Sequence, residues 1–151
     1  MILPTEEYNK FMAANFKLLI YAGKKLKLFP ENVTEKQFLN STLEVKAECR
    51  NEVVNNNKLL DDFFANELDN LTTEDISILE GFRKRITGKF LLVKCLSKHA
   101  ILQNVETNNY YAVLCLSTPL DEIFYDIPTL IYATILPFKG KIITDGLPSK
   151  F

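Results

Sequence analysis

The hydrophobic residues in the first half of this chain recur every three or four positions, which is the spacing of one apolar face of an α-helix. Four helices are predicted from this spacing. The first begins at the cap and acidic residues of Pro4-Thr5-Glu6-Glu7, weakens around Gly23 and is closed by Phe29-Pro30. The next begins at a Thr34 capping box, and the last is ended by Gly88. These three later helices are predicted over residues 34–55, 59–68 and 72–87.

From Gly88 onward the pattern is that of strands. β-branched and aromatic residues form short apolar runs separated by turn residues, as in hairpins. The stretch from Ile127 to Leu147 indicates a strand, a turn at Pro137-Phe138-Lys139-Gly140, a second strand and an Asp145-Gly146 turn. Phe138 lies between two breakers and is predicted to be buried between sheet and helices. The five predicted strands cover residues 90–96, 100–105, 110–116, 129–136 and 141–144, and a single helical turn covers 119–124.

Helices followed by strands indicate an α+β protein. The strands are apolar at most positions on both sides, which favours a curled sheet or small barrel over a flat sheet with one wet face. We therefore expect an N-terminal helical half of about four helices, residues 1–87, packed on a C-terminal five-stranded curled antiparallel sheet or small barrel, residues 88–151. The two halves are expected to form one compact unit.

Composition narrows the functional classes. The formal net charge of -1 provides no whole-protein field that would attract nucleic acid or an anionic membrane. The N-terminus lacks the layout of a signal peptide, and no apolar run reaches the roughly 20 residues that cross a bilayer. Three cysteines, odd in number and widely spaced, favour a reducing compartment over a disulfide framework. A cytoplasmic protein that does not engage a membrane is expected.

The C-terminal segment resembles a group of uncharacterised bacterial proteins. The residues that carry the resemblance are Leu136-Pro137-Phe138-Lys139-Gly140-Lys141-Ile142-Ile143 and Asp145-Gly146. In that group the segment reads Leu-Pro-Phe-Lys-Gly/Asp-Lys-Ile-Ile-Tyr-Asp-Gly, so this chain departs from it at Thr144, where an aromatic residue is usual. The resemblance covers the strand-forming part of the chain. It implies the same fold class and a bacterial or mobile-element setting, and it implies no activity. Some of these proteins carry a cysteine-rich zinc tail that this sequence lacks, so zinc is not implied.

Catalytic residues are sparse. His99 is the only histidine and lies in a predicted hairpin turn, where an exposed and inert side chain is expected. Cys115 or Cys95 with His99 and Asp121 would supply a nucleophile, a base and an orienting group, but cysteines within apolar strands usually pack as small hydrophobic residues. Four carboxylates are candidates for a metal site or an acid–base pair, although two of them belong to turn signals: Asp121, Glu122, Asp126 and Asp145. No metal or cofactor is predicted.

Basic and aromatic residues suggest binding instead. On a small barrel they would contact single-stranded nucleic acid by stacking and by phosphate contacts. Alternation places Tyr110 and Tyr111 on opposite faces of their strand, so that only one of them is available. The predicted contact residues are Arg83, Arg85, Lys89, Tyr110, Tyr111, Lys139 and Lys141.

The sequence therefore favours a non-enzymatic cytoplasmic binding module for a macromolecular partner, either a protein or a single-stranded nucleic acid. The alternative is a small hydrolase or nuclease that uses the carboxylates or Cys115 with His99. The oligomeric state and the identity of the partner stay open.

Overall fold

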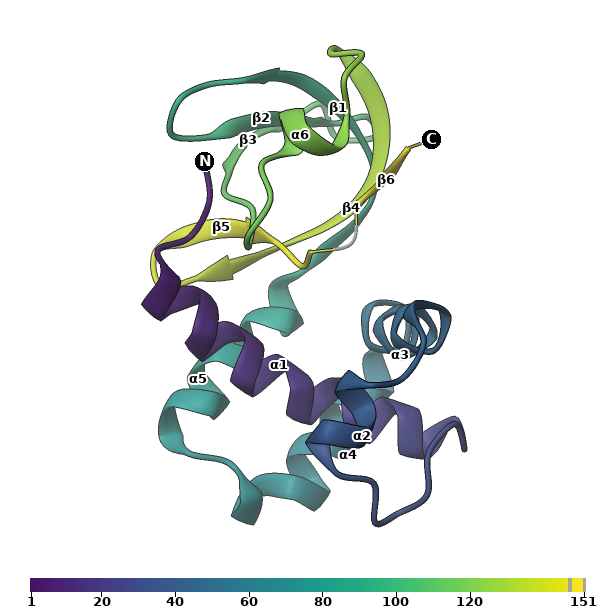
Figure 1. Ribbon diagram of the computed structural model, residues 1–151. Coiled ribbons are helices and arrows are strands. Elements are labelled where there is room, and N and C mark those ends of the chain that lie inside the picture. The colour runs from purple at the N-terminus through teal and green to yellow at the C-terminus, as the bar shows by residue number, and fades with distance from the viewer. Residues whose placement is uncertain (147, 151) are drawn as a thin grey trace. The chain divides into compact units, whose positions relative to one another are not determined.

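The structure is a computed structural model that describes residues 1–146 and 148–150 (Figure 1). The chain forms two compact units. One contains Asn9–Arg83 and is helical, whereas the other contains Met1–Tyr8 together with the residues from Lys84 onward and holds the strands. The predicted α+β class is confirmed, with helices in the N-terminal half and a curled antiparallel sheet in the C-terminal half.

The helices that begin after Thr34, Thr42, Asn56 and Thr72 start at residues whose side chains bond the free backbone groups of a helix end. The predicted capping box is present, because the Thr34 hydroxyl accepts from the Gln37 N–H and the Gln37 side chain accepts from the Thr34 N–H. The prediction of a single helix over 34–55 is wrong, since Thr42 caps a new helix by accepting from the N–H of Val45. The helical elements are α1 (Thr5–Lys25), α2 (Glu35–Leu39), α3 (Leu43–Asn55), α4 (Asn57–Glu67), η1 (Leu68–Asn70), α5 (Thr73–Glu80) and the 3-10 turn η2 (Gly81–Lys84).

Aromatic rings fill the centre of the helical unit. Its fully buried rings include Phe11, Phe38, Phe63 and Phe82. Gly23 is also buried, and a Cβ atom built on it would lie 2.5 Å from the ring of Phe29. The sequence predicts that α1 weakens at this glycine, but the helix continues past it. Gly23 thus makes room for a neighbouring ring and does not end the helix.

The described strands are paired in the order β3-β2-β1-β4-β5, and β6 pairs with β4. Every neighbouring pair is antiparallel. Gly88 lies within β1 opposite Ala133, so the prediction that it ends the fourth helix is wrong. The strands and the short helix among them are β1 (Ile86–Cys95), β2 (Ala100–Asn104), β3 (Tyr110–Val113), α6 (Leu120–Ile123), β4 (Thr129–Phe138), β5 (Lys141–Thr144) and β6 (Ser149–Lys150).

The sheet curls so far that the chain leaving β3 meets β5 (Figure 1). Leu114 donates to the carbonyl of Ile142 at 2.9 Å and accepts from the N–H of Thr144 at 3.0 Å. Cys115 in turn donates to the carbonyl of Met1 at 2.9 Å. The concave side of the curl encloses the core. The buried core side chains include Phe90, Leu92, Leu102, Val113, Leu120, Phe124, Ile131 and Ile135.

The turn between β4 and β5 forms where the sequence predicts it. Lys139 and Gly140 adopt positive φ angles of 48° and 76°, and Phe138 is 3% exposed, which confirms that its ring is buried. At the Asp145-Gly146 turn the glycine has φ 97°. Leu147, the last residue of the stretch that the sequence singled out, lies outside the described residues.

Candidate binding face

The curled sheet has two faces with different roles. Because side chains alternate along a strand, one side of each strand contributes to the core and the other side points away from it. We call the side of β1–β4 that points away from the core the outer face. Its side chains are Thr87, Lys89, Leu91, Lys94, Ile101, Gln103, Tyr110, Ala112, Leu130 and Tyr132.

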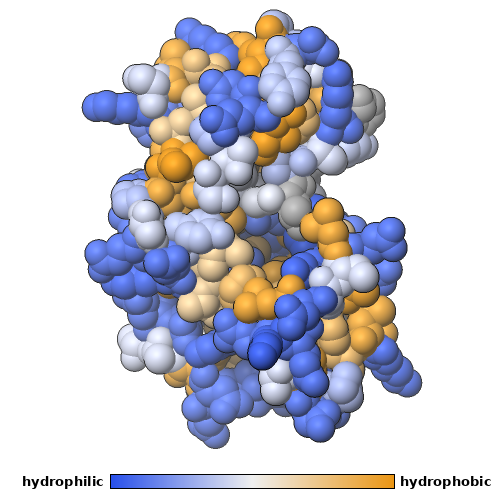
Figure 2. All heavy atoms as spheres, viewed as in Figure 1, coloured by the Kyte–Doolittle hydropathy of each residue, from blue (hydrophilic) through white to orange (hydrophobic). Residues whose placement is uncertain are grey.

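One row of the outer face crosses four strands. Tyr110 on β3 is opposite Gln103 on β2, Gln103 is opposite Leu91 on β1, and Leu91 is opposite Leu130 on β4. Tyr132 follows two residues after Leu130 and therefore points to the same side. Tyr110 is 64% exposed, Tyr132 is 47% exposed and Leu130 is 38% exposed. Figure 2 shows hydrophobic side chains, in orange, reaching the molecular surface between hydrophilic ones.

The charged side chains of the outer face lie on its central strand. Lys89 is opposite Tyr132, and Lys94 is opposite Ile101 beyond an irregularity between Leu92 and Lys94. None of the outer-face positions named above is an aspartate or a glutamate. The local charge of this face is therefore positive, although the whole chain carries a net charge of -1.

The two adjacent tyrosines of β3 point in opposite directions, as alternation predicts. Tyr111 is half-buried and packs against the core, where its ring meets that of Phe90 edge-on at 6.4 Å between centroids. Tyr110 is the exposed member of the pair. Of these two adjacent tyrosines, only Tyr110 can therefore contact a partner on the outer face.

Two of the predicted contact residues are in ion pairs within their own units. Arg83 belongs to the helical unit, and its guanidinium donates to Asp61 at 2.6 Å and to Glu80 at 2.8 Å. Lys141 on β5 donates to both carboxylate oxygens of Glu7, at 2.8 and 2.6 Å. These pairs give each cation a role in folding, and the predicted binding roles remain predictions.

The other two predicted cations lie outside the strands that form the outer face. Arg85 is in the segment between η2 and β1, and partial burial lowers the pKa of its guanidinium from the ordinary value. Lys139 is in the β4–β5 turn, with its ammonium 5.8 Å from the centre of the Phe138 ring. The structure thus brings Lys89 and Tyr110 together on the outer face and places the remaining predicted residues elsewhere.

Sequence reasoning missed Tyr132 and Leu130. The signal that identifies them is the alternation in β4, where exposed Leu130 and Tyr132 flank buried Ile131. Because residues 129–136 are apolar at most positions, the sequence predicts that both sides of this strand are buried. The pairing of β4 with β1 places its outward residues beside those of β1.

The cysteine and histidine candidates do not form a catalytic set among the described residues. Burial raises the pKa of the Cys115 thiol to about 11, although hydrogen bonds to the Leu120 backbone and to Thr144 oppose the rise. The Cys95 pKa is also raised, by partial burial and by the charge of Asp121. Both thiols therefore stay protonated at neutral pH. His99 is half-buried in the β1–β2 hairpin and has no hydrogen bond to Asp121 or to either thiol.

The carboxylate candidates are dispersed. Asp121 and Glu122 form the first turn of α6 and line an open pocket of about 500 Å³ beside Cys95. Asp126 pairs with Lys150 at 3.4 Å. Across residues 1–146 and 148–150, no group of three or more His, Cys, Asp and Glu side chains is placed to hold a metal ion.

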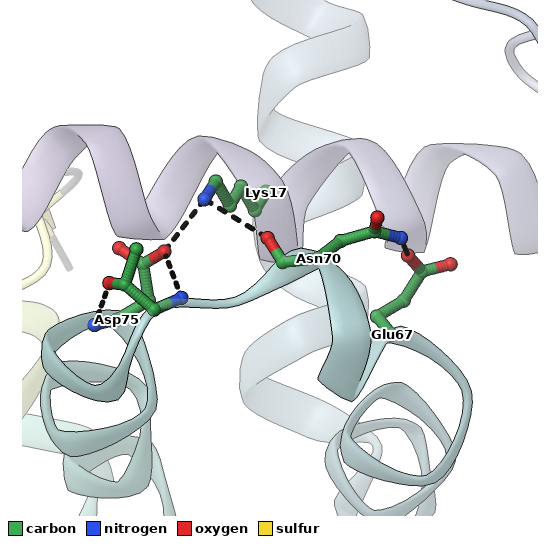
Figure 3. Close-up of polar contacts among 5 residues, drawn as sticks. Lys17, Glu67, Asn70 and Asp75 are labelled. Carbon is green, nitrogen blue, oxygen red and sulfur yellow. Dashed lines mark hydrogen bonds and ion pairs between the residues drawn. The ribbon is translucent and has the colours of Figure 1, made fainter.

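The helical unit contains one well-connected polar network (Figure 3). The ammonium of Lys17 on α1 donates to Asp75 at 2.6 Å and to the carbonyl of Asn70 at 3.3 Å. Asp75 also accepts from the Thr72 N–H in the capping box of α5. Partial burial opposes ionisation of Asp75, but the hydrogen bonds from Lys17 and Thr72 and the charge of Lys17 outweigh it and lower its pKa. The network fixes the start of α5 against α1.

A pocket of about 180 Å³ lies beside this network. It is lined by Lys17, Tyr21, Lys24 and Glu67 and by apolar side chains that include Phe63. Because Lys17 is already bonded to Asp75 and Asn70, we assign the network to stabilisation of the helices.

Comparison of the chain with protein-family models, with curated proteins and with solved structures finds no match. The described helices include none that is both long enough and apolar enough to span a bilayer.

Proposed function

We propose that this protein is a non-enzymatic binding module that holds a macromolecular partner on the outer face of its sheet. The observation that carries the proposal is the exposure of Tyr110 and Tyr132 on the same face, with Leu130 beside Tyr132, on strands held in register by backbone hydrogen bonds. Large exposed rings on a rigid scaffold supply contact area with little loss of side-chain entropy. Four strands about 4.8 Å apart make this face roughly 15–20 Å wide, which is the scale of a macromolecular contact and not of a small-molecule cleft.

The proposed compartment is the cytoplasm. The described cysteines Cys49, Cys95 and Cys115 are all free thiols, which fits a reducing environment. The bacterial setting that the sequence resemblance implies belongs to the same proposal.

The alternative of a small hydrolase or nuclease has weaker support. A cysteine nucleophile needs a lowered pKa or an adjacent base, and both Cys95 and Cys115 have raised pKa values. The open pocket beside α6 brings Cys95, Asp121 and Glu122 together, but His99 does not line it. A binding role uses the features of the outer face, whereas catalysis would need a base for a thiol whose pKa is raised.

Affinity capture with matched variants tests the binding role. The wild-type protein, a Tyr110→Thr/Tyr132→Thr double variant and a Tyr125→Thr control would be immobilised and exposed to host extract. Tyr125 is 85% exposed and lies between α6 and β4, so the control removes an exposed ring outside the outer face. We expect a protein or nucleic acid that the wild type and the control retain and the double variant loses. Identical recovery by all three proteins would refute binding through this face.

A further inference from the structure

We propose that the partner held on the outer face is a single-stranded nucleic acid, with separate bases stacked on Tyr110 and Tyr132 and phosphates held by Lys89 and Lys94. This inference rests on the proposed function and specifies the chemistry of its partner. The observations that carry it are the separation of the two rings, the position of the two lysines on β1, a strand between those of the rings, and the absence of carboxylates from the outer-face positions.

The separation of the rings fits two different bases of one strand. Tyr110 is on β3 and Tyr132 is on β4, with β2 and β1 between them. Three strand spacings, with an offset of two residues along β4, put the two rings about 15 Å apart. Rings at that distance cannot stack on the same base. A flexible single strand that crosses β1 and β2 would present one base to each ring, and the intervening nucleotides would lie over the central strands.

The charge between the rings fits a polyanion. Lys89 and Lys94 both come from β1, the strand that lies between the two tyrosines in the sheet. A backbone that runs from one ring to the other passes over this strand beside Lys89, which is opposite Tyr132, whereas Lys94 lies farther along β1 and would contact phosphates of nucleotides that continue along that strand. With no aspartate or glutamate among the outer-face positions, a polyanion would meet no repulsive charge there.

The same charges disfavour a protein partner. The buried centre of a protein–protein interface is typically depleted of charged residues, with lysine among those that are disfavoured. Here the lysines lie on β1, inside the row of four strands, and the large exposed rings lie on the two outer strands of that row, β3 and β4. Aromatic stacking with nearby cations is the arrangement by which sheet surfaces bind unpaired bases.

A single strand fits this face better than a duplex. Stacking requires base faces that are exposed, and a duplex hides them. A duplex would have to be held through phosphates alone, and a chain of net charge -1 with two lysines on this face provides few phosphate contacts. If two phosphates are neutralised, log K should fall against log salt concentration with a slope of about -1.4. Stacking should provide the larger share, about 1–3 kcal/mol per base.

The test is a fluorescence-anisotropy titration of labelled oligouridylate and oligothymidylate of about 12 nucleotides, a length within the range that small sheet and barrel folds contact. We expect binding by the wild type at low salt. Tyr110→Thr and Tyr132→Thr should each weaken it about 5- to 150-fold, whereas Tyr110→Phe and Tyr132→Phe should retain it. Lys89→Gln or Lys94→Gln should reduce the magnitude of the salt slope by about 0.7. A duplex of the same length should bind more weakly than either strand.

The control variants separate this face from other surfaces. Tyr125→Thr and Lys58→Gln change an exposed ring and an exposed cation outside the outer face and should leave the oligonucleotide affinity unchanged. Circular dichroism of every variant confirms that the fold is intact. Absence of oligonucleotide binding by the wild type overturns the inference, as does equal binding by the wild type and both tyrosine-to-threonine variants.

Failure of this inference is distinguishable from failure of the proposed function. If capture recovers a protein that depends on Tyr110 and Tyr132 while oligonucleotides do not bind, the partner class is wrong and the binding face stands. If capture and titration both show no dependence on the two tyrosines, the proposed function is refuted as well.

Discussion

Replacing Gly23 by alanine tests the packing of the helical unit, because the structure leaves no room for a methyl group there. The new Cβ would lie 2.5 and 2.8 Å from two carbons of the Phe29 ring and 3.0 Å from the sulfur of Cys49. Ordinary carbon–carbon contacts are about 3.5–4.0 Å, so the ring has to retreat by roughly 1 Å. That movement disturbs its edge-on contact with Phe38, which now has a centroid distance of 5.8 Å.

Two opposing contributions decide how much Gly23→Ala changes the free energy of unfolding. Overpacking of this kind costs about 1–3 kcal/mol, whereas alanine is about 1 kcal/mol more favourable than glycine inside a helix. We therefore expect Gly23→Ala to lower the free energy of unfolding by about 1 kcal/mol, which is roughly 2–4 °C in Tm for a chain of this size. In a Phe29→Ala background the ring clash is absent and the Cys49 sulfur, 3.0 Å from the new Cβ, can move into the space that the ring leaves, so the helix term should dominate and the same substitution should stabilise. This change of sign is the decisive observation.

Gly88→Ala is the matched control. Gly88 is in a strand, and a Cβ atom there meets nothing within 4 Å. Alanine at this position should therefore raise stability by about 0.5–1 kcal/mol. Urea denaturation followed by circular dichroism measures all four variants. If Gly23→Ala destabilises equally with and without the Phe29 ring, the steric argument is refuted, and if Gly88→Ala destabilises, the strand assignment of Gly88 is refuted.

Four further substitutions test individual side chains that stabilise the fold. Phe138→Ala should lower the free energy of unfolding by about 3–5 kcal/mol, because the ring is 3% exposed, and a urea midpoint that barely moves would contradict its burial. Lys141→Gln and Glu7→Gln should each lower the free energy of unfolding by about 1 kcal/mol, and the two effects should not add in the double variant because the residues bond each other. A Lys141→Gln variant that lost ligand affinity at unchanged stability would show instead that this lysine is a contact residue. Asp75→Asn should cost about 1–3 kcal/mol near neutral pH. Because the folded-state pKa of Asp75 is lowered below its ordinary 3.8, this stabilisation is present above the unfolded-state pKa and is lost as the pH falls through the folded-state pKa. The wild type and Asp75→Asn should therefore converge in acid, and a difference that persists there would refute the linkage.

Features with a local cause could be predicted from the sequence. The capping box at Thr34 needs only four consecutive residues, and the opposite directions of Tyr110 and Tyr111 need only the two-residue period of a strand. The sequence places Gly88 wrongly at the end of a helix, because glycine is frequent after helices and depleted in strands. Neighbouring residues do not distinguish the two cases, and the pairing of Gly88 with Ala133 decides between them.

Features that depend on chain topology could not be predicted. Lys141 and Glu7 are 134 residues apart, and their pairing follows from the contact of the first eight residues with the sheet. The row from Tyr110 to Leu130 requires the registers of three strand pairs, and the irregularity after Leu92 changes one of those registers. The sequence could therefore nominate contact residues but could not select those that share a face.

The outer face also bears on why the two tyrosines are present. Tyrosine is favoured in strands for reasons of packing alone, so exposed rings at Tyr110 and Tyr132 do not by themselves require a ligand. Threonine has a comparable preference for strands but no ring, which is why tyrosine-to-threonine variants separate folding from binding. If the rings serve only the sheet, both variants lose stability and the proposed ligand is unnecessary. If stability stays within about 0.5 kcal/mol of the wild type while binding falls, the exposed rings have no folding function and their presence is explained by the partner.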